Sequence, residues 1–217
     1  MRAKTLKLAT LAFILVGAVA CKNNEKEIEK ELVAASEASE TATEYTVDKD
    51  ESLIKWEGSK PTATHHGTMK LDSGVLLVNE GQIEAGKFLI DMKSITDEDL
   101  EGEYKDNLEA HLKGTAEGKE GDFFNVNEYP TATFEWTGYE NDVIKGNLTI
   151  KDKTNPIEFV AKVSVDDTQI TIHSEPIKLD RTKWGVNFGS KSVFDNLGDK
   201  FINDIMIIKV DLVAKKM

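Results

Sequence analysis

The sequence predicts an all-β protein whose strands form an antiparallel barrel or two stacked sheets. Apolar and polar residues alternate with a period of two over most of residues 45–217, which is typical of strands with one buried face. Turn signals at residues 72–74 (Asp-Ser-Gly) and 79–81 (Asn-Glu-Gly) separate these runs, and such short links favour antiparallel neighbours. Strands that each carry one apolar face bury it by closing into a barrel or by stacking.

Residues 1–20 have the pattern of a secretory signal peptide. Arg2, Lys4 and Lys7 form a basic head, and residues 8–20 are apolar, uncharged and rich in small side chains. This stretch is too short for a transmembrane helix, which needs about 20 apolar residues. A basic start, a short apolar core and small residues at the exit favour cleavage after residue 20.

The single cysteine, Cys21, directly follows the sequence Ala-Val-Ala. This position resembles the lipobox of bacterial lipoproteins, in which the cysteine thiol is diacylated and the signal is cut before it. The alternative is an ordinary signal peptide followed by an incidental cysteine. Two or more acyl chains make membrane anchoring stable, so we expect a lipid-anchored protein of the bacterial cell envelope.

Residues 21–44 are expected to form the lipidated cysteine and a flexible acidic tether, ahead of a barrel domain at residues 45–217. Residues 22–44 are rich in Glu, Lys and Ala and contain no aromatic residue, Gly or Pro, a composition that favours a solvated spacer. Lys22 is not the aspartate associated with retention at the inner membrane. Sorting to the outer membrane is therefore expected, on either its periplasmic or its surface face.

The predicted strands follow from residues that alternate toward one apolar face, while the residues between them are mostly polar or charged. In chain order the inward positions are Ile54, Trp56 and Gly58; Gly86, Phe88, Ile90 and Met92; Ala132, Phe134, Trp136 and Gly138; Ile144, Gly146, Leu148 and Ile150; Ile157, Phe159, Ala161, Val163 and Val165; and Met206, Ile208, Val210 and Leu212. In a closed barrel of about 8 strands, the interior is either just filled by side chains or holds one small ligand. The alternation leaves both possibilities open.

One segment, residues 97–112, departs from the strand pattern and is predicted to be an amphipathic helix. Thr96 or Asp97 could cap its start, and Gly114 could end it. Its apolar stripe has a spacing of four and consists of Leu100, Tyr104, Leu108 and Leu112. We expect this helical insertion to pack against the strands or to cover one mouth of the barrel.

Composition and motifs exclude several functions. Lys and Arg number 27 against 39 Asp and Glu, a net charge of -12, so nucleic acid is not an expected partner. No nucleophile elbow, P-loop or dinucleotide-binding motif occurs, and no cofactor or enzymatic activity is expected. His65 and His66 are adjacent and would point to opposite faces of a strand, so no metal site is expected from this pair.

Several sequence blocks occur in a characteristic order over residues 45–214. The most specific is Phe-Phe-x-Val-x-x-Tyr-Pro-x-Ala-x-Phe at residues 123–134. Others include Trp-Glu-Gly-Ser-Lys at 56–60, Thr-His-His-Gly-Thr at 64–68, Gly-Asn-Leu-Thr-Ile at 146–150 and Arg-Thr-Lys-Trp-Gly at 181–185. Together these blocks resemble the YceI-like family of secreted bacterial proteins.

The resemblance implies an extended lipocalin-like antiparallel β-barrel of about eight strands with one helical insertion. It also implies that the barrel stores, transports or protects a long apolar chain such as a polyisoprenoid, a prenyl quinone or a fatty amide. The expected lining residues are the inward side chains Trp56, Phe88, Ile90, Phe134, Trp136, Leu148, Phe159 and Trp184. The alternative is a packed barrel without a ligand, with a structural or stress-response role in the envelope.

Candidates for contact with a polar head group are Arg181, in the Arg-x-x-Trp-Gly block, and His65 or His66, near a turn. The alternative interpretation is that Arg181 pairs with a surface carboxylate and that Trp184 fills the core.

Overall fold

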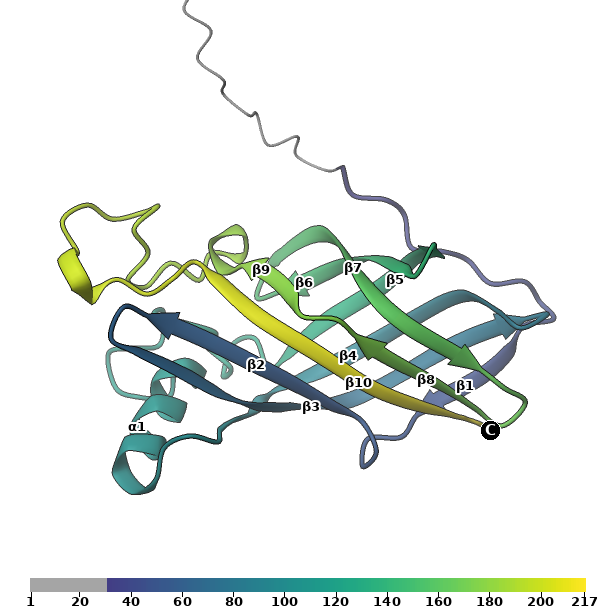
Figure 1. Ribbon diagram of the computed structural model, residues 1–217, viewed down its shortest axis with the longest axis horizontal. Coiled ribbons are helices and arrows are strands. Elements are labelled where there is room, and N and C mark those ends of the chain that lie inside the picture. The colour runs from purple at the N-terminus through teal and green to yellow at the C-terminus, as the bar shows by residue number, and fades with distance from the viewer. Residues whose placement is uncertain (1–30) are drawn as a thin grey trace, which may run out of the picture.

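The computed structural model describes residues 31–217 (Figure 1), so the expected signal peptide and Cys21 lie outside the described residues. Its helical segments are α1 (Gly102–Lys113) and two short 3-10 turns, η1 (Arg181–Trp184) and η2 (Gly198–Lys200). Within the described residues, no helix is both long and apolar enough to cross a membrane. The strands are β1 (Thr43–Val47), β2 (Leu53–Lys60), β3 (Ala63–Asn79), β4 (Gln82–Asp97), β5 (Thr131–Glu140), β6 (Val143–Ile150), β7 (Lys153–Val165), β8 (Gln169–Ser174), β9 (Ile177–Asp180) and β10 (Ile205–Lys216).

The strands close into an antiparallel barrel. Each strand from β2 to β8 pairs with the next, and β10 pairs with both β2 and β8, so these eight strands form a ring. β9 and β8 pair with successive stretches of one edge of β10, while β2 and β1 pair with successive stretches of its other edge. β1 and β9 therefore lengthen the barrel without widening it. The predicted all-β antiparallel barrel of about eight strands is confirmed.

Two tight turns set the register of the long hairpins. Glu80 and Gly81 link β3 to β4 with φ angles of 49° and 77°, and Asn141 and Asp142 link β5 to β6 with φ angles of 52° and 62°. Two-residue turns with positive φ at both positions match the right-handed twist of the paired strands. Gly, Asn and Asp accept this conformation at low cost, which explains why turn signals occur at these positions.

The end of the barrel that carries β1 has a packed interior. Tyr45 of β1 is buried beside Leu76 and Val78 of β3 and Ile170 of β8, and all four side chains belong to one apolar cluster. The Tyr45 hydroxyl donates to the backbone oxygen of Asp166 at 2.9 Å, which ties β1 to the β7–β8 turn. This end lies opposite the end that carries α1 (Figure 1).

α1 begins later than the sequence predicted. β4 continues to Asp97, because Ile95 and Thr96 are β-branched and remain in the ladder against β3. The chain then turns at Asp97, whose Oδ1 accepts hydrogen bonds from the backbone nitrogens of Asp99 at 3.2 Å and Leu100 at 2.7 Å. The helix therefore begins at Gly102, and the predicted start at residue 97 is wrong.

Only the second half of the predicted apolar stripe of α1 packs on the barrel. Leu108 and Leu112 border the barrel interior, whereas Tyr104 is 79% exposed to solvent. The helix ends at Gly114, which has a φ of 68° in the left-handed region, as predicted. α1 thus covers part of one end of the barrel, as Figure 1 shows.

The amides of α1 are expected to exchange with solvent faster than those of β6. None of the residues of α1 is buried, and the helix holds to the barrel through few apolar side chains, so it can open without disrupting the ring. Hydrogen exchange followed by mass spectrometry measures the two segments in one experiment. Protection of residues 103–113 equal to that of residues 143–150 would show instead that α1 is an integral part of the core.

The described part of the expected tether is fixed to the barrel wall. The side-chain amide of Asn147 donates to the backbone oxygen of Val33 at 2.6 Å, and the backbone nitrogen of Ser36 donates to the oxygen of Trp136 at 3.0 Å. Further along, the backbone nitrogen and the hydroxyl of Ser39 both donate to Glu84 Oε2, at 2.7 and 2.8 Å. The expectation of a free spacer up to residue 44 is therefore wrong for residues 33–39.

Candidate functional site

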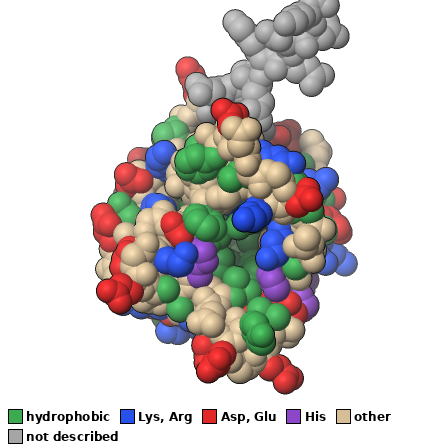
Figure 2. Space-filling model, turned by 90° about the vertical axis from the view of Figure 1, so that its left-hand side faces the viewer, with side chains coloured by type: hydrophobic (Ala, Val, Ile, Leu, Met, Phe, Trp, Pro, Cys, Tyr) green, Lys and Arg blue, Asp and Glu red, His purple; other side chains and the backbone are tan. Residues whose placement is uncertain are grey.

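The barrel contains an apolar cavity of about 430 Å³ at the end that carries α1. Its volume falls within the 300–1,000 Å³ range that is usual for small-molecule sites. Figure 2 shows the opening at this end, with hydrophobic side chains inside it and Lys, Arg and His side chains around it. The interior is thus packed at one end and hollow at the other, so a barrel that is filled throughout is excluded.

The cavity wall is built largely from the inward positions that the alternation predicted. Aromatic and aliphatic side chains from β2, β4, β5, β6 and β7 contribute to it. Seven of the eight predicted lining residues border the cavity: Trp56, Phe88, Ile90, Phe134, Trp136, Leu148 and Phe159. A surface of this kind offers no fixed hydrogen-bond pattern, so it suits an apolar chain rather than a sugar or a nucleotide.

Three phenyl rings from neighbouring regions of the wall contact one another. The ring centroids of Phe88 and Phe134 are 6.2 Å apart, and those of Phe134 and Phe159 are 5.9 Å apart. Gly146, on the intervening strand β6, makes this row possible, because a Cβ atom there would lie 2.1 Å from Phe134 Cζ. A glycine on β6 therefore determines where the central ring of the row lies.

Replacing Gly146 with alanine is expected to lower the free energy of unfolding by about 1–3 kcal/mol, the usual cost of overpacking. The new methyl group would displace the Phe134 ring and would also meet the backbone oxygen of Glu135 at 2.6 Å. Urea denaturation of the two proteins measures the difference. Gly58→Ala is the matched control, because a Cβ atom there meets nothing within 4 Å. If the two variants lost the same free energy of unfolding, the close contact between position 146 and the Phe134 ring would not explain the loss.

Polar side chains gather at the rim of the cavity. They come from the β2–β3 hairpin, from α1 and from the segment between η1 and β10. The polar residues that border the cavity are Glu57, Ser59, Lys60, His65, His111, Arg181, Lys200 and Asn203. The cavity therefore has an apolar interior and one polar end, an arrangement that matches a ligand with a long tail and a polar head.

A family described as the YceI-like domain matches residues 45–214, which is most of the chain. The protein belongs to the YceI-like family. The match begins in β1 and ends in β10, so it includes every strand of the barrel.

Solved structures with the same fold include two whose resemblance extends over most of the YceI-like domain. Burkholderia cenocepacia BcnA has a TM-score of 0.56 and 20% identity, and the similarity covers 77% of this chain and 98% of that one. A polyisoprenoid binding domain from Saccharophagus degradans, implicated in plant cell wall breakdown, has a TM-score of 0.56 and 14% identity, with 80% and 98% covered. At these identities the likeness shows the shared barrel fold alone.

Among curated proteins, UPF0312 proteins of Staphylococcus aureus are similar to part of the chain. The protein of strain bovine RF122 / ET3-1 is 37% identical over 76 residues, which is 32% of this chain and 44% of that protein. The protein of strain N315 is 36% identical over the same length. The match thus spans less than half the length of these relatives.

Two of the predicted site residues of the YceI-like domain do not border the cavity. Trp184 is only 2% exposed, and its Nε1 donates to the backbone oxygen of Leu148 at 2.9 Å, so it fills the core outside the cavity wall. His66 points away from the barrel interior, whereas its neighbour His65 borders the cavity. Alternation along β3 separates these two histidines, as the sequence indicated.

Arg181 borders the cavity, but its donors bind the protein itself. The guanidinium donates to the backbone oxygens of Val186 at 2.6 Å, Ile202 at 3.1 Å and Asn203 at 3.1 Å, and it lies 3.5 Å from Asp204 Oδ1. These contacts join the two ends of the segment at residues 186–204. The predicted head-group role of Arg181 is therefore not supported. The alternative, in which Arg181 pairs with a carboxylate, describes only its contact with Asp204, since its other partners are backbone oxygens.

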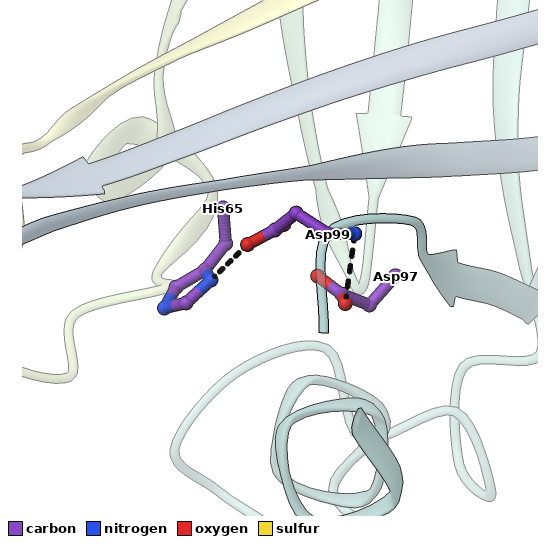
Figure 3. A group of neighbouring side chains, drawn as sticks. All are labelled: His65, Asp97 and Asp99. Atoms are coloured by element: carbon purple, nitrogen blue, oxygen red, sulfur yellow. Dashed lines mark hydrogen bonds and ion pairs between the residues drawn. The ribbon is translucent and has the colours of Figure 1, made fainter. Parts of the chain in front are cut away.

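Three ionisable side chains beside the cavity mouth form a group that the sequence did not predict. His65 from β3 lies near Asp97, the last residue of β4, and near Asp99, two residues beyond it (Figure 3). The imidazole Nδ1 of His65 is 2.9 Å from Asp99 Oδ2. Two aspartates two residues apart at a strand end were visible in the sequence, but only the β3–β4 pairing brings them next to a histidine.

Proposed function

We propose that this YceI-like protein binds one long-chain apolar ligand inside its barrel and stores, transports or protects it in the bacterial cell envelope. The observation that carries this proposal is the apolar cavity of about 430 Å³ with a single polar rim. The proposed ligand classes are polyisoprenoids, prenyl quinones and fatty amides. The name of one structural neighbour, a polyisoprenoid binding domain, supports the first of these classes.

The shape and chemistry of the cavity favour one orientation of such a ligand. Transfer of a hydrocarbon chain from water to an apolar site is favourable by about 0.8 kcal/mol per CH₂ group, so the tail belongs in the aromatic interior. The packed core around Tyr45 and Leu76 closes the far end. The head group would then lie at the rim, near Lys60, His65 and Lys200.

The proposed activity is binding rather than catalysis. Both histidines at the rim contact carboxylates of the protein itself: His65 Nδ1 lies 2.9 Å from Asp99 Oδ2, and His111 Nε2 lies 2.7 Å from Asp122 Oδ2. The cavity wall consists of hydrocarbon and aromatic side chains. A site of this kind excludes water from an apolar chain and releases the same molecule.

Extraction of lipids from natively purified protein, followed by mass spectrometry, tests the proposal. A long-chain lipid in one-to-one ratio is expected from the wild type. Ile90→Trp adds bulk at a lining position and is expected to reduce the recovered lipid at least tenfold. Leu89→Trp is the matched control, because adjacent residues of β4 face opposite sides of the sheet and Leu89 is not part of the cavity wall. Wild-type protein without lipid, or equal retention in the two variants, would contradict the proposal.

Anchoring through Cys21 is a separate part of the proposal. Cys21→Ser is expected to abolish incorporation of labelled palmitate and cleavage of the lipoprotein type, because the thiol that would be acylated is removed. Palmitate labelling of whole cells, followed by gel electrophoresis, measures both effects. Labelling of the variant as strong as that of the wild type would show that the chain is not anchored at this residue.

A further inference from the structure

His65, Asp97 and Asp99 converge on one small space at the edge of the barrel mouth. Their ligand-type atoms, one ring nitrogen and two carboxylate oxygens, all lie within 4.8 Å of one another. Figure 3 shows the three side chains directed toward one another, with His65 on β3, Asp97 at the end of β4 and Asp99 in the turn that follows it. His65 also borders the cavity, which places the group beside the opening.

The backbone holds both carboxylates in position. Asp97 Oδ1 accepts from the backbone nitrogens of Asp99 and Leu100, at 3.2 and 2.7 Å. Asp99 Oδ1 accepts from the backbone nitrogen of His66 at 2.8 Å. The Oδ2 atom of each aspartate is therefore left for the shared space, where Asp99 Oδ2 faces His65 Nδ1 at 2.9 Å. Such outer hydrogen bonds orient carboxylate ligands in metal sites.

Asp97 has no partner for its second oxygen. The side chain is fully buried, with an exposed fraction of 0%, and Oδ2 makes no hydrogen bond within the described part of the chain. This buried oxygen without a partner, beside His65 and Asp99, is a ligand position that a bound cation would fill.

Neither lysine of α1 is directed toward these aspartates. Lys105 and Lys113 lie on α1 nearby, but their ammonium groups are directed to Glu109, at 3.9 and 3.1 Å. Glu109 in turn accepts from the backbone nitrogen of Asp97 at 3.0 Å. The space between the two Oδ2 atoms is therefore left open to a small cation.

We propose that His65, Asp97 and Asp99 bind one divalent metal ion of the zinc class. Zinc binds both imidazole nitrogen and carboxylate oxygen, and in open sites three protein ligands leave the fourth tetrahedral position to water. Calcium and magnesium prefer six or more oxygen ligands and are disfavoured by the imidazole and by the small number of oxygens. The proposed metal site does not depend on whether the cavity binds a lipid.

Calorimetric titration of the chelator-treated, full-length chain with zinc chloride tests the proposal. One zinc ion per chain is expected. Asp97→Asn and His65→Gln are each expected to weaken the affinity at least tenfold. Asparagine at position 97 keeps an oxygen that can accept from Asp99 and Leu100, so the turn is preserved. His65→Gln changes a residue at the rim and remains decisive if the first variant does not fold.

A second histidine–aspartate pair provides the matched control. His173 Nδ1 lies 2.9 Å from Asp211 Oδ1 on the outer surface, where both side chains are exposed. His173→Gln is expected to leave the zinc affinity unchanged. Cobalt titration adds a spectroscopic readout, because absorption bands of a tetrahedral cobalt site should appear in the wild type and in His173→Gln alone. A wild type that binds no zinc, or unchanged affinity in the two site variants, would overturn the proposal.

Discussion

Replacing Arg181 with methionine is expected to lower the free energy of unfolding by about 3–5 kcal/mol, the usual cost of removing one partner from a buried charged network. The substitution would leave three backbone oxygens, those of Val186, Ile202 and Asn203, without their donor. It would also leave Asp204 without its positively charged neighbour. Because these contacts join the ends of residues 186–204, this segment should become sensitive to protease before the barrel unfolds.

Chemical denaturation and limited proteolysis together measure this effect. Lys87→Met is the control, since Lys87 forms an exposed ion pair with Glu135 at 2.9 Å, and pairs of this kind contribute about 0–1 kcal/mol. If Arg181→Met were no less stable than Lys87→Met, the guanidinium would not hold this segment. The head-group role for Arg181 would then have to be considered again.

Truncation of Trp184 to alanine is expected to cost about 3–5 kcal/mol, because the indole is almost fully buried outside the cavity and its removal creates a new void. Its hydrogen bond to the backbone oxygen of Leu148 would be lost as well. Since Trp184 does not border the cavity, the amount of bound lipid should remain that of the wild type. Thermal or urea unfolding and lipid extraction measure the two quantities separately.

Phe159→Ala provides the contrasting variant. Phe159 borders the cavity and is only partly buried, so its truncation enlarges an existing space and should cost about 1–2 kcal/mol. Lipid retention should change in this variant, because the wall of the cavity changes. A larger loss of stability for Phe159→Ala than for Trp184→Ala would contradict the division of the interior into a packed part and a hollow part.

Most of the barrel could be predicted from alternation alone. The inward residues assigned to the last strand, Met206, Ile208, Val210 and Leu212, all border the cavity. The reason is local, since successive side chains of a strand point to opposite faces whatever the rest of the chain does. The same rule separated His65 from His66. The alternation rule could not predict where the Trp184 side chain points, because this residue lies in a 3-10 turn, where side chains do not alternate between two faces.

The boundaries of the helix and the tether depended on contacts that are distant in sequence. The spacing of Leu100, Tyr104, Leu108 and Leu112 indicated a helix, but pairing of β4 with β3 kept residues 95–97 in the sheet. Similarly, the composition of residues 33–39 resembles a solvated spacer. Partners from β4, β5 and β6, including Glu84 and Asn147, nevertheless fix this segment on the barrel.

By itself, the sequence determined the strand faces, the tight turn at residues 79–81 and the apolar character of the interior, because each depends on neighbouring residues. The turn predicted at residues 72–74 is wrong, because these residues continue β3 across a register shift in its ladder with β4. Only the tertiary structure decided that the interior is hollow at one end. That outcome depends on how eight strands close and on which side chains meet across the ring. The group of His65, Asp97 and Asp99 has the same origin, because His65 is distant in the chain from the two aspartates and the β3–β4 ladder brings them together.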